Sequence, residues 1–157
     1  MKLRNPHNIG RLALSAALFL AALPALAAGP YQFFAVSPCR LVDTRLAAGP
    51  NAGPPIARMT QRDFQVQGKC GVPVGAKAAA LNLTVLNAGG TGWIAAWPSG
   101  SAQPTVSNVN FLNGENGLSN GAIVPLSTNA NDLSTFTFLG AQNSTMNLVI
   151  DVNGYFM

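Results

Sequence analysis

Histidine and cysteine are nearly absent from this sequence, and their scarcity excludes several kinds of chemistry. The single histidine, His7, lies in an N-terminal stretch with the features of an export signal, so cleavage of that stretch leaves no histidine. Histidine is a frequent general base and the most common metal ligand in proteins. A Ser–His–Asp or Cys–His catalytic unit cannot be built without it. A zinc site is not expected either, because the only two cysteines are predicted to pair with each other.

The N-terminal stretch is predicted to be a signal peptide spanning residues 1–27. Its positively charged start is followed by the apolar run Leu12–Leu23, and Ala25-Leu-Ala27 has the small-x-small pattern of a cleavage site. The apolar run is shorter than the roughly 20 residues that span a bilayer. We therefore expect residues 28–157 to form one exported domain in the periplasm, at the cell surface or outside the cell, with no membrane insertion after cleavage.

Charged residues are also scarce. Three of the nine basic residues lie in the predicted signal, and the six that remain face five acidic residues, which gives a net charge of +1. None of these basic residues lies after Lys77. A nucleic-acid partner is not expected, because the chain lacks the basic stripe typical of such binders. Low net charge also means weak self-repulsion, which permits association between copies.

Cys39 and Cys70 are the only two thiols. An even number of cysteines in an exported chain predicts a disulfide. The alternative is a pair of free thiols in a reducing compartment.

Short runs of β-forming residues, separated by glycine, proline and asparagine, fill the rest of the chain. No long segment has helical periodicity, and the pattern predicts about nine strands. Their spacing favours an all-β fold, a single β-sandwich of the jelly-roll kind with one disulfide. The expected strands are 31–36, 40–44, 58–67, 79–87, 93–97, 106–112, 122–126, 133–139 and 146–156. Alternation puts Leu81, Leu83 and Val85 on one face of 79–87, and Phe136 and Phe138 on one face of 133–139. In 146–156, the residues expected to point inward are Met146, Leu148, Ile150 and Val152.

Two tryptophans and several asparagines are candidate ligand-binding residues. Trp93 and Trp97 alternate with Ala95, so they share one strand face, which favours packing in the core. The alternative is an aromatic platform for a sugar, with amide side chains to bind its hydroxyls. The candidates for such a site are Trp93, Trp97, Tyr155, Asn108 and Asn110.

The segment Arg40–Arg45 is the densest polar cluster, and we expect a structural role for Arg40, Asp43, Thr44 and Arg45. Asp43 and Arg45 are two residues apart and would share a face on a strand. Arg40 would face the other way unless Pro38 or a bulge shifts the register. An Asp–Arg pair can serve as a ligand clamp for a sugar or a carboxylate. A structural ion pair beside the disulfide is the favoured interpretation.

Oxygen-rich side chains gather in residues 108–120 and again in residues 129–132. Calcium binds such oxygens, but each stretch has one carboxylate and neither has a complete calcium-loop pattern. Asparagine and glycine also favour turns for local reasons. No metal site and no cofactor are therefore expected, and calcium is the remaining alternative. The five acidic residues outside the predicted signal form no catalytic motif, so no enzyme is expected.

Six segments follow one another in a fixed order: PCRLVDTR (38–45), CGVP (70–73), LNLTV (81–85), WPSG (97–100), SNVNF (107–111) and IDVNGYF (150–156). Together they resemble a widespread and poorly characterised family of all-β domains in secreted and surface bacterial proteins. This resemblance implies an exported module without an established activity, and it transfers no catalytic residue. It implies architectural roles for Asp43, Thr44 and Arg45, and for Gly154 and Tyr155 at the end of the last strand.

These observations favour a non-catalytic extracellular module that has a structural or interaction role. We expect it to assemble with itself through edge strands, with the segment Asp151–Phe156 pairing at a sheet edge of another copy. The alternative is a carbohydrate-binding module. The expected partners are accordingly a second copy of the chain, or a glycan or protein at a surface.

Overall fold

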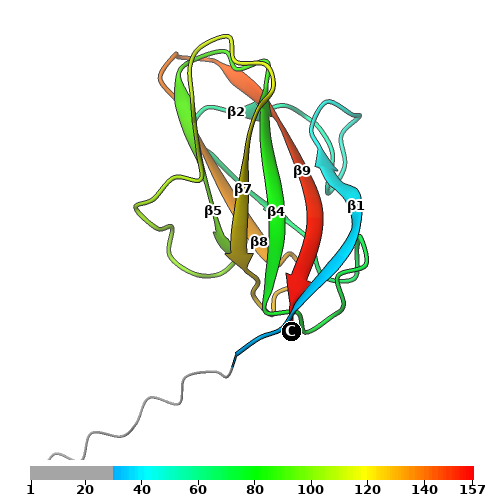
Figure 1. Cartoon of the computed structure of the whole chain (residues 1–157). Coiled ribbons are helices and arrows are strands. Elements are labelled where there is room, and N and C mark those ends of the chain that lie inside the picture. The colour runs from blue at the N-terminus through cyan, green and yellow to red at the C-terminus, as the bar shows by residue number, and fades with distance from the viewer. Residues whose placement is uncertain (1–29) are drawn as a thin grey trace, which may run out of the picture.

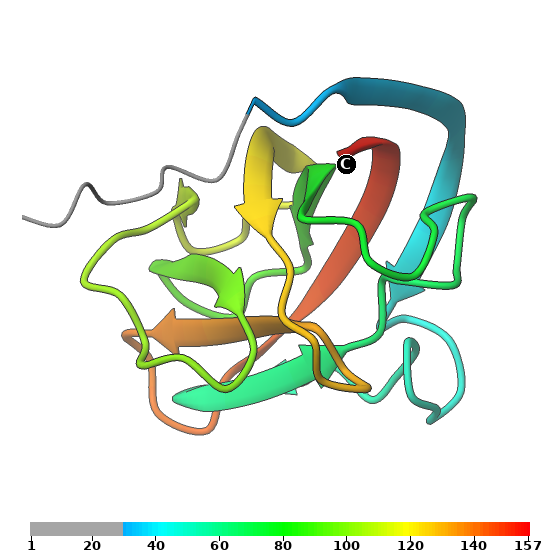
Figure 2. The same ribbon diagram turned by 90° about the horizontal axis from the view of Figure 1, so that it is seen from below.

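Two antiparallel β-sheets packed face to face make up the part of the chain that this computed structural model describes, residues 30–157 (Figure 1). The predicted signal peptide 1–27 lies outside the described residues. Viewed along the strands, the sheets form two separate layers (Figure 2). The first sheet contains β1 (Phe33–Asp43), β2 (Ile56–Ala57), β4 (Ala78–Leu86), β7 (Leu118–Pro125) and β9 (Thr145–Phe156). The second contains β3 (Thr60–Phe64), β5 (Gly92–Pro98), β6 (Val109–Phe111) and β8 (Leu133–Leu139).

The order of the strands is that of a jelly roll. It runs β1-β9-β4-β7 in the first sheet, with β2 also pairing with β9, and β3-β8-β5-β6 in the second. From β2 onward, every connection crosses from one sheet to the other, except the one between the neighbours β5 and β6. This arrangement of eight main strands in two sheets confirms the prediction of an all-β sandwich of the jelly-roll kind.

The core lies between the sheets and is built from the alternating apolar residues of the longer strands. In β4, buried and half-buried residues alternate along the whole strand. Leu83 and Val85 of β4 are fully buried, as are Leu148 and Ile150 of β9. Alternation places successive side chains on opposite faces of a strand. The shared apolar face predicted for 79–87 is therefore the buried one, and the inward face predicted for 146–156 is confirmed.

The first strand is longer than expected. Segments 31–36 and 40–44 were expected as separate strands broken by Pro38, but β1 runs through this proline. It does so with register shifts between Ala35 and Cys39 and between Arg40 and Val42. Because β1 is an edge strand with β9 as its partner, a bulged proline is tolerated there.

The expected strand 58–67 is shorter in the structure, where only β3 lies within it, and the unexpected short strand β2 precedes it. Met59 lies between them with a φ of 56°, in the left-handed region that ends regular pairing. β2 pairs with β9, whereas β3 pairs with β8, so the chain changes sheets at this residue. The alternation of apolar residues in this segment does not predict that the chain changes sheets.

The last strand lies inside its sheet, which corrects the expectation that Asp151–Phe156 pairs with another copy. β9 is hydrogen-bonded to β1 on one side and to β4 on the other. Both of its sides are therefore paired within the sheet, so the strand offers no free edge to a partner.

Cys39 and Cys70 form the predicted disulfide, with a Cα–Cα distance of 5.5 Å. The bridge joins β1 to the turn-rich segment before β4. Neither cysteine of the described chain is free. Within residues 30–157, no helix has the length and apolar character needed to cross a membrane.

Candidate functional site

Trp93 lies on the outer face of the second sheet, not between the sheets. In β5 the residues that point into the core are Ile94, fully buried, and Ala96, 7% exposed. Trp93, Ala95 and Trp97 therefore share the opposite face, as the alternation predicted, but that face points outward. The expectation of core packing is wrong for Trp93, which is half-buried on this outer face, whereas Trp97 is buried as expected. The pattern could not separate the two cases, because β5 is apolar on both faces.

Three aromatic side chains lie together on this outer face: Trp93, Phe136 and Phe138. We call them the aromatic platform. The ring centroid of Trp93 lies 5.5 Å from that of Phe136 and 5.9 Å from that of Phe138. All three rings are half-buried. Neighbouring strands bring them together, because Trp93 of β5 pairs with Phe138 of β8. Phe136 and Phe138 share a face, as their spacing predicted.

Trp97 lies on the same face but is closed to solvent. Its side chain is only 4% exposed, and its indole N–H donates a hydrogen bond of 3.1 Å to the carbonyl oxygen of Ser101. A buried indole with a satisfied donor is a packing residue. Of the two tryptophans, Trp93 alone can offer part of its ring to a ligand.

A first hollow of about 630 Å³ lies beside Trp93, under the loop that leads to β6. It is lined by Trp93, Gln103, Pro104, Thr105, Val106, Ser107 and Asn110. Ser107 and Asn110 hold each other: the Asn110 amide donates to Ser107 Oγ at 2.9 Å, and Ser107 Oγ lies 3.1 Å from Asn110 Oδ1. The exposed Asn110 side chain is thus fixed at the rim with hydrogen-bonding capacity to spare.

A second hollow of about 380 Å³ lies on the other side of Trp93. The register explains the arrangement, since Trp93 pairs with Asn110 and Gly92 pairs with Phe111. The first hollow extends from the Trp93–Asn110 pair toward Ser107, and the second extends toward Leu112. The second hollow is lined by Thr91, Gly92, Trp93, Asn110, Phe111, Leu112 and Phe138.

The other candidates for a sugar site lie apart from Trp93 or are engaged elsewhere. Asn108 Oδ1 accepts a hydrogen bond of 2.7 Å from the backbone N–H of Ala96, so this side chain pairs with the β5 backbone. Tyr155 belongs to the first sheet and stacks on Phe34 at 5.2 Å. The structure therefore brings Trp93 and Asn110 together and leaves Trp97, Tyr155 and Asn108 outside the site.

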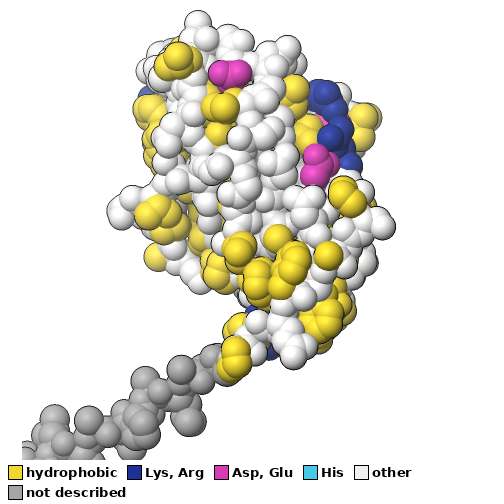
Figure 3. Space-filling model, viewed as in Figure 1, with side chains coloured by type: hydrophobic (Ala, Val, Ile, Leu, Met, Phe, Trp, Pro, Cys, Tyr) yellow, Lys and Arg dark blue, Asp and Glu magenta, His cyan; other side chains and the backbone are white. Residues whose placement is uncertain are grey.

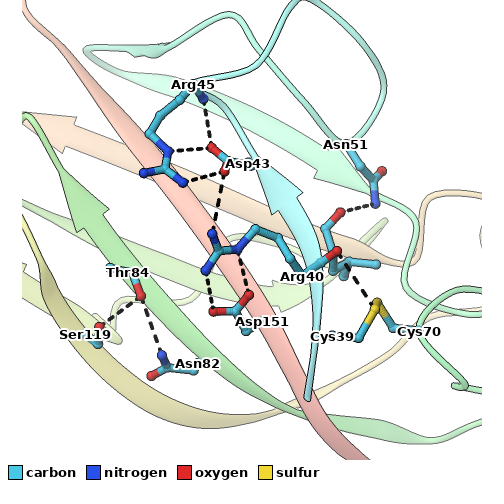
Figure 4. Close-up of polar contacts among 11 residues, drawn as sticks. Cys39, Arg40, Asp43, Arg45, Asn51, Cys70, Asn82, Thr84, Ser119 and Asp151 are labelled. Carbon is cyan, nitrogen blue, oxygen red and sulfur yellow. Dashed lines mark hydrogen bonds and ion pairs between the residues drawn. A yellow bond between two sulfur atoms is a disulfide. The ribbon is translucent and has the colours of Figure 1, made fainter. Parts of the chain in front are cut away.

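The expected polar cluster lies on the outer face of the first sheet, where the charges pair internally (Figure 4). Arg40 donates to Asp151 at 2.9 and 3.1 Å, and its guanidinium lies 3.8 Å from Asp43. Arg45 donates to Asp43 through Nε at 2.8 Å, through Nη2 at 2.6 Å and through its backbone N–H at 3.1 Å. The bulge between Arg40 and Val42 turns Arg40 toward this face, as a shifted register requires.

Electrostatics favour the ionised forms of this cluster. Hydrogen bonds from Arg45 hold the pKa of Asp43 below its ordinary value, although burial acts in the opposite direction. The hydrogen bond to Asp151 raises the pKa of Arg40. Thr44 is fully buried, and its hydroxyl accepts a hydrogen bond of 2.8 Å from the backbone N–H of Leu148. These contacts support the structural interpretation of the cluster over a ligand clamp.

The carboxylates of the two oxygen-rich stretches are engaged with backbone amides. Asp132 is fully buried, and its two oxygens accept hydrogen bonds of 2.8 Å from the N–H groups of Val66 and Gln67. Glu115 accepts a hydrogen bond of 3.2 Å from the N–H of Asn116. Across residues 30–157, no three His, Cys, Asp or Glu side chains come together in a way that could hold a metal ion.

Several residues of the site gave no signal in the sequence. Gln103, Thr105 and Ser107 belong to an irregular loop whose position over β5 depends on tertiary structure. Asp151 was placed on the last strand, but its pairing with Arg40 depends on the order of the strands.

Comparisons with known proteins give little further information. No family model matches the sequence, and no curated protein matches it. Among solved structures, the chain is similar to the coat protein dimer of tobacco streak virus, with a TM-score of 0.36 and 10% sequence identity. The similarity covers 79% of this chain and 86% of the coat protein chain. Similarity at this level supports no statement about function.

Proposed function

We propose that this protein is an exported, non-catalytic module that binds carbohydrate on the outer face of its second sheet. One observation carries the proposal: Trp93, half-buried and partly open to solvent, lies where two hollows meet and beside the fixed amide of Asn110. This arrangement combines an apolar ring face with a few oriented polar groups, which is the usual composition of a small-ligand site.

The chemistry of the site suits a sugar. The C–H face of a sugar ring is apolar and packs against an aromatic face, while hydroxyls at its edge need donors and acceptors. Trp93 supplies the ring face, and Asn110, Gln103 and Thr105 supply amide and hydroxyl groups at its border.

The carboxylates support a non-catalytic role. Asp43 and Asp151 are paired with arginines on the first sheet, away from Trp93. Asp63 accepts hydrogen bonds from Ser134 at 2.7 Å and from Gln61 at 3.0 Å. None of these acids lines either hollow beside Trp93, so the proposed site has no group for acid–base chemistry on a bound sugar.

Export is part of the proposal. The predicted signal peptide 1–27 and the Cys39–Cys70 disulfide support it, because disulfides persist mainly in oxidising compartments. The resemblance to secreted and surface bacterial domains points in the same direction.

A pull-down assay on insoluble polysaccharides tests the proposal. The mature protein is mixed with cellulose, chitin, xylan and cell-wall peptidoglycan, and the bound fraction is measured. We expect retention on at least one of them and its loss in Trp93→Ala, with no change in Val74→Ala. Val74 is 80% exposed and lies before β4, outside the site, so it is a matched surface control. Retention on none of them, or equal retention of wild type and Trp93→Ala, would overturn the proposal.

Self-association is a second candidate, favoured by an apolar patch on the outer face of the first sheet. Phe33 is 52% exposed and Ile123 is 65% exposed, and the half-buried Phe156 packs against Phe33 at 5.2 Å. Figure 3 shows apolar side chains gathered in the lower part of this face, where β9 ends in Figure 1. Exposed apolar patches on a stable fold often mark interaction surfaces. Light scattering tests this candidate: an oligomer that Ile123→Arg converts to a monomer would support it, and a monomeric wild type would exclude it.

A further inference from the structure

We propose that the ligand is an uncharged polysaccharide held along its length, with one sugar unit in each hollow and the chain crossing Trp93. The proposal rests on the proposed function and defines its ligand class more closely. It makes the site a groove for internal units of a chain, and not a pocket for a single sugar.

The positions of the two hollows indicate that the ligand spans both of them. Both are lined by Trp93 and Asn110, and they extend from this pair in opposite directions along β5 and β6. A ligand confined to one hollow would leave the other side of the shared Trp93–Asn110 pair without a contact. A chain that crosses the pair contacts both hollows.

The sizes of the two hollows indicate that each can hold one sugar unit. Their volumes are about 630 and 380 Å³. Each lies within the range of roughly 300–1,000 Å³ that is typical of small-ligand pockets. Each hollow is thus large enough to hold a sugar ring by itself, and together they match at least two consecutive units.

The lining of the two hollows indicates the charge of the ligand. None of the residues that line them is charged, which favours an uncharged ligand. The first hollow has the side chains of Gln103, Thr105, Ser107 and Asn110 as its polar groups, and the second has Thr91 and Asn110. Arg58 lies over Phe138 at 5.9 Å, but it lines neither hollow and its Nε donates to the carbonyl oxygen of Leu139. Without a cation in the lining, an acidic sugar would lose its hydration without gaining an ion pair.

Exposed apolar side chains mark the two hollows separately and make the proposal testable. Val106 of the first hollow is 59% exposed, and Leu112 of the second is 69% exposed. Both are too exposed for their replacement to disturb the core. Val106→Arg and Leu112→Arg therefore place a bulky side chain in one hollow each, and Val74→Arg places the same side chain on a surface remote from both.

The experiment measures affinity against chain length. Oligosaccharides of one to six units, prepared from the polysaccharide that the mature protein retains, are titrated calorimetrically into wild type and the three variants. We expect affinity to rise by at least about tenfold between one unit and the longer oligomers, since each additional contact of about 1.4 kcal/mol is worth this factor. Both Val106→Arg and Leu112→Arg should reduce binding of the longer oligomers, and Val74→Arg should leave it unchanged.

The outcomes separate this proposal from the proposed function. Affinity that does not depend on length, or loss of binding in only one of the two hollow variants, would overturn the two-hollow groove while leaving sugar binding at Trp93 intact. Tighter binding of acidic oligomers of galacturonic acid would overturn the uncharged ligand class. Binding that survives in Trp93→Ala would overturn the proposed function itself.

Discussion

Arg40 on β1 and Asp151 on β9 are joined by two hydrogen bonds across the outer face of the first sheet, although 111 residues separate them in the chain. The contact links the edge strand β1 to the inner strand β9 at the position where β1 has a bulge. The same Arg40 also approaches Asp43, which is held by Arg45. Local and distant parts of the chain thus share one network of alternating charges.

The Arg40–Asp151 pair should contribute only modestly to stability. The Arg40 side chain is 51% exposed, and exposed pairs of this kind couple by about 0.2–1 kcal/mol. A double-mutant cycle with Arg40→Ala and Asp151→Ala, followed by urea unfolding, measures this coupling. It should decrease as salt is added, because the pair is screened. A coupling well above this range, or one insensitive to salt, would contradict the prediction.

Stability should depend on the ionisation of Asp43 at acidic pH. Hydrogen bonds from Arg45 lower the folded-state pKa of Asp43 from its ordinary value of 3.8. The contact therefore stabilises the fold fully above that value, and the contribution is lost as the pH falls through the lower folded-state pKa. Melting temperatures of wild type and Asp43→Asn should differ at neutral pH and converge below pH 3.8. A difference that persists unchanged into strong acid would show that the carboxylate charge is not responsible.

Removal of the Cys39–Cys70 disulfide should destabilise the fold substantially. The two cysteines are 31 residues apart. In the chain-entropy model, a loop of this length contributes about 3–4 kcal/mol. Urea unfolding of the Cys39→Ser, Cys70→Ser double variant measures the loss. Reductant should destabilise the wild type and have no effect on the double variant, and an equal effect on both would point to another cause.

The two tryptophans should respond differently to a polar quencher. Trp93 is half-buried on the aromatic platform, whereas Trp97 is 4% exposed. Acrylamide should therefore quench part of the fluorescence, and Trp93→Phe should leave an emission that is almost fully protected. If that variant is quenched as strongly as the wild type, Trp97 is accessible and the assignment of the exposed ring is wrong.

A side chain at Gly154 should not fit beneath Phe33. A Cβ atom built there meets the Phe33 ring and lies 2.6 Å from the carbonyl oxygen of Phe34. Overpacking of this kind costs about 1–3 kcal/mol, so Gly154→Ala should lower the free energy of unfolding by about that amount. Gly121→Ala on β7 is the matched control, because no atom lies within 4 Å of its added Cβ. Equal effects of the two substitutions would exclude the contact with Phe33 as the cause.

Much of the fold was predictable because its strands carry local patterns. The segment 133–139 matches β8 residue for residue, and the predicted inward faces of β4 and β9 are the buried ones. The pairing of Cys39 with Cys70 followed from their number together with the predicted export signal. Each of these features depends on residues that are close in the chain or on the identity of one residue type.

The remaining features depend on contacts between distant segments. Nothing local distinguishes an inner strand from an edge strand, so the position of β9 between β1 and β4 could not be foreseen. The outward face of Trp93 was missed because Ile94 and Ala96 are also apolar. The loop that carries Gln103 and Thr105 has no pattern that places it beside Trp93. The site therefore combines two residues that the sequence had singled out for their chemistry, Trp93 and Asn110, with others that only the fold brings near.

The inner position of β9 also sets the order in which the molecule can form during synthesis. β1 pairs with β9 alone among the described strands, so the first strand to leave the ribosome has no partner until the last one is made. Such long-range pairing is slow, and it leaves β1 and β4 without their shared neighbour in every shorter intermediate. Until β9 is made, the first sheet can therefore contain only its β4–β7 pair, and β1 stays exposed to chaperones that bind unpaired strands.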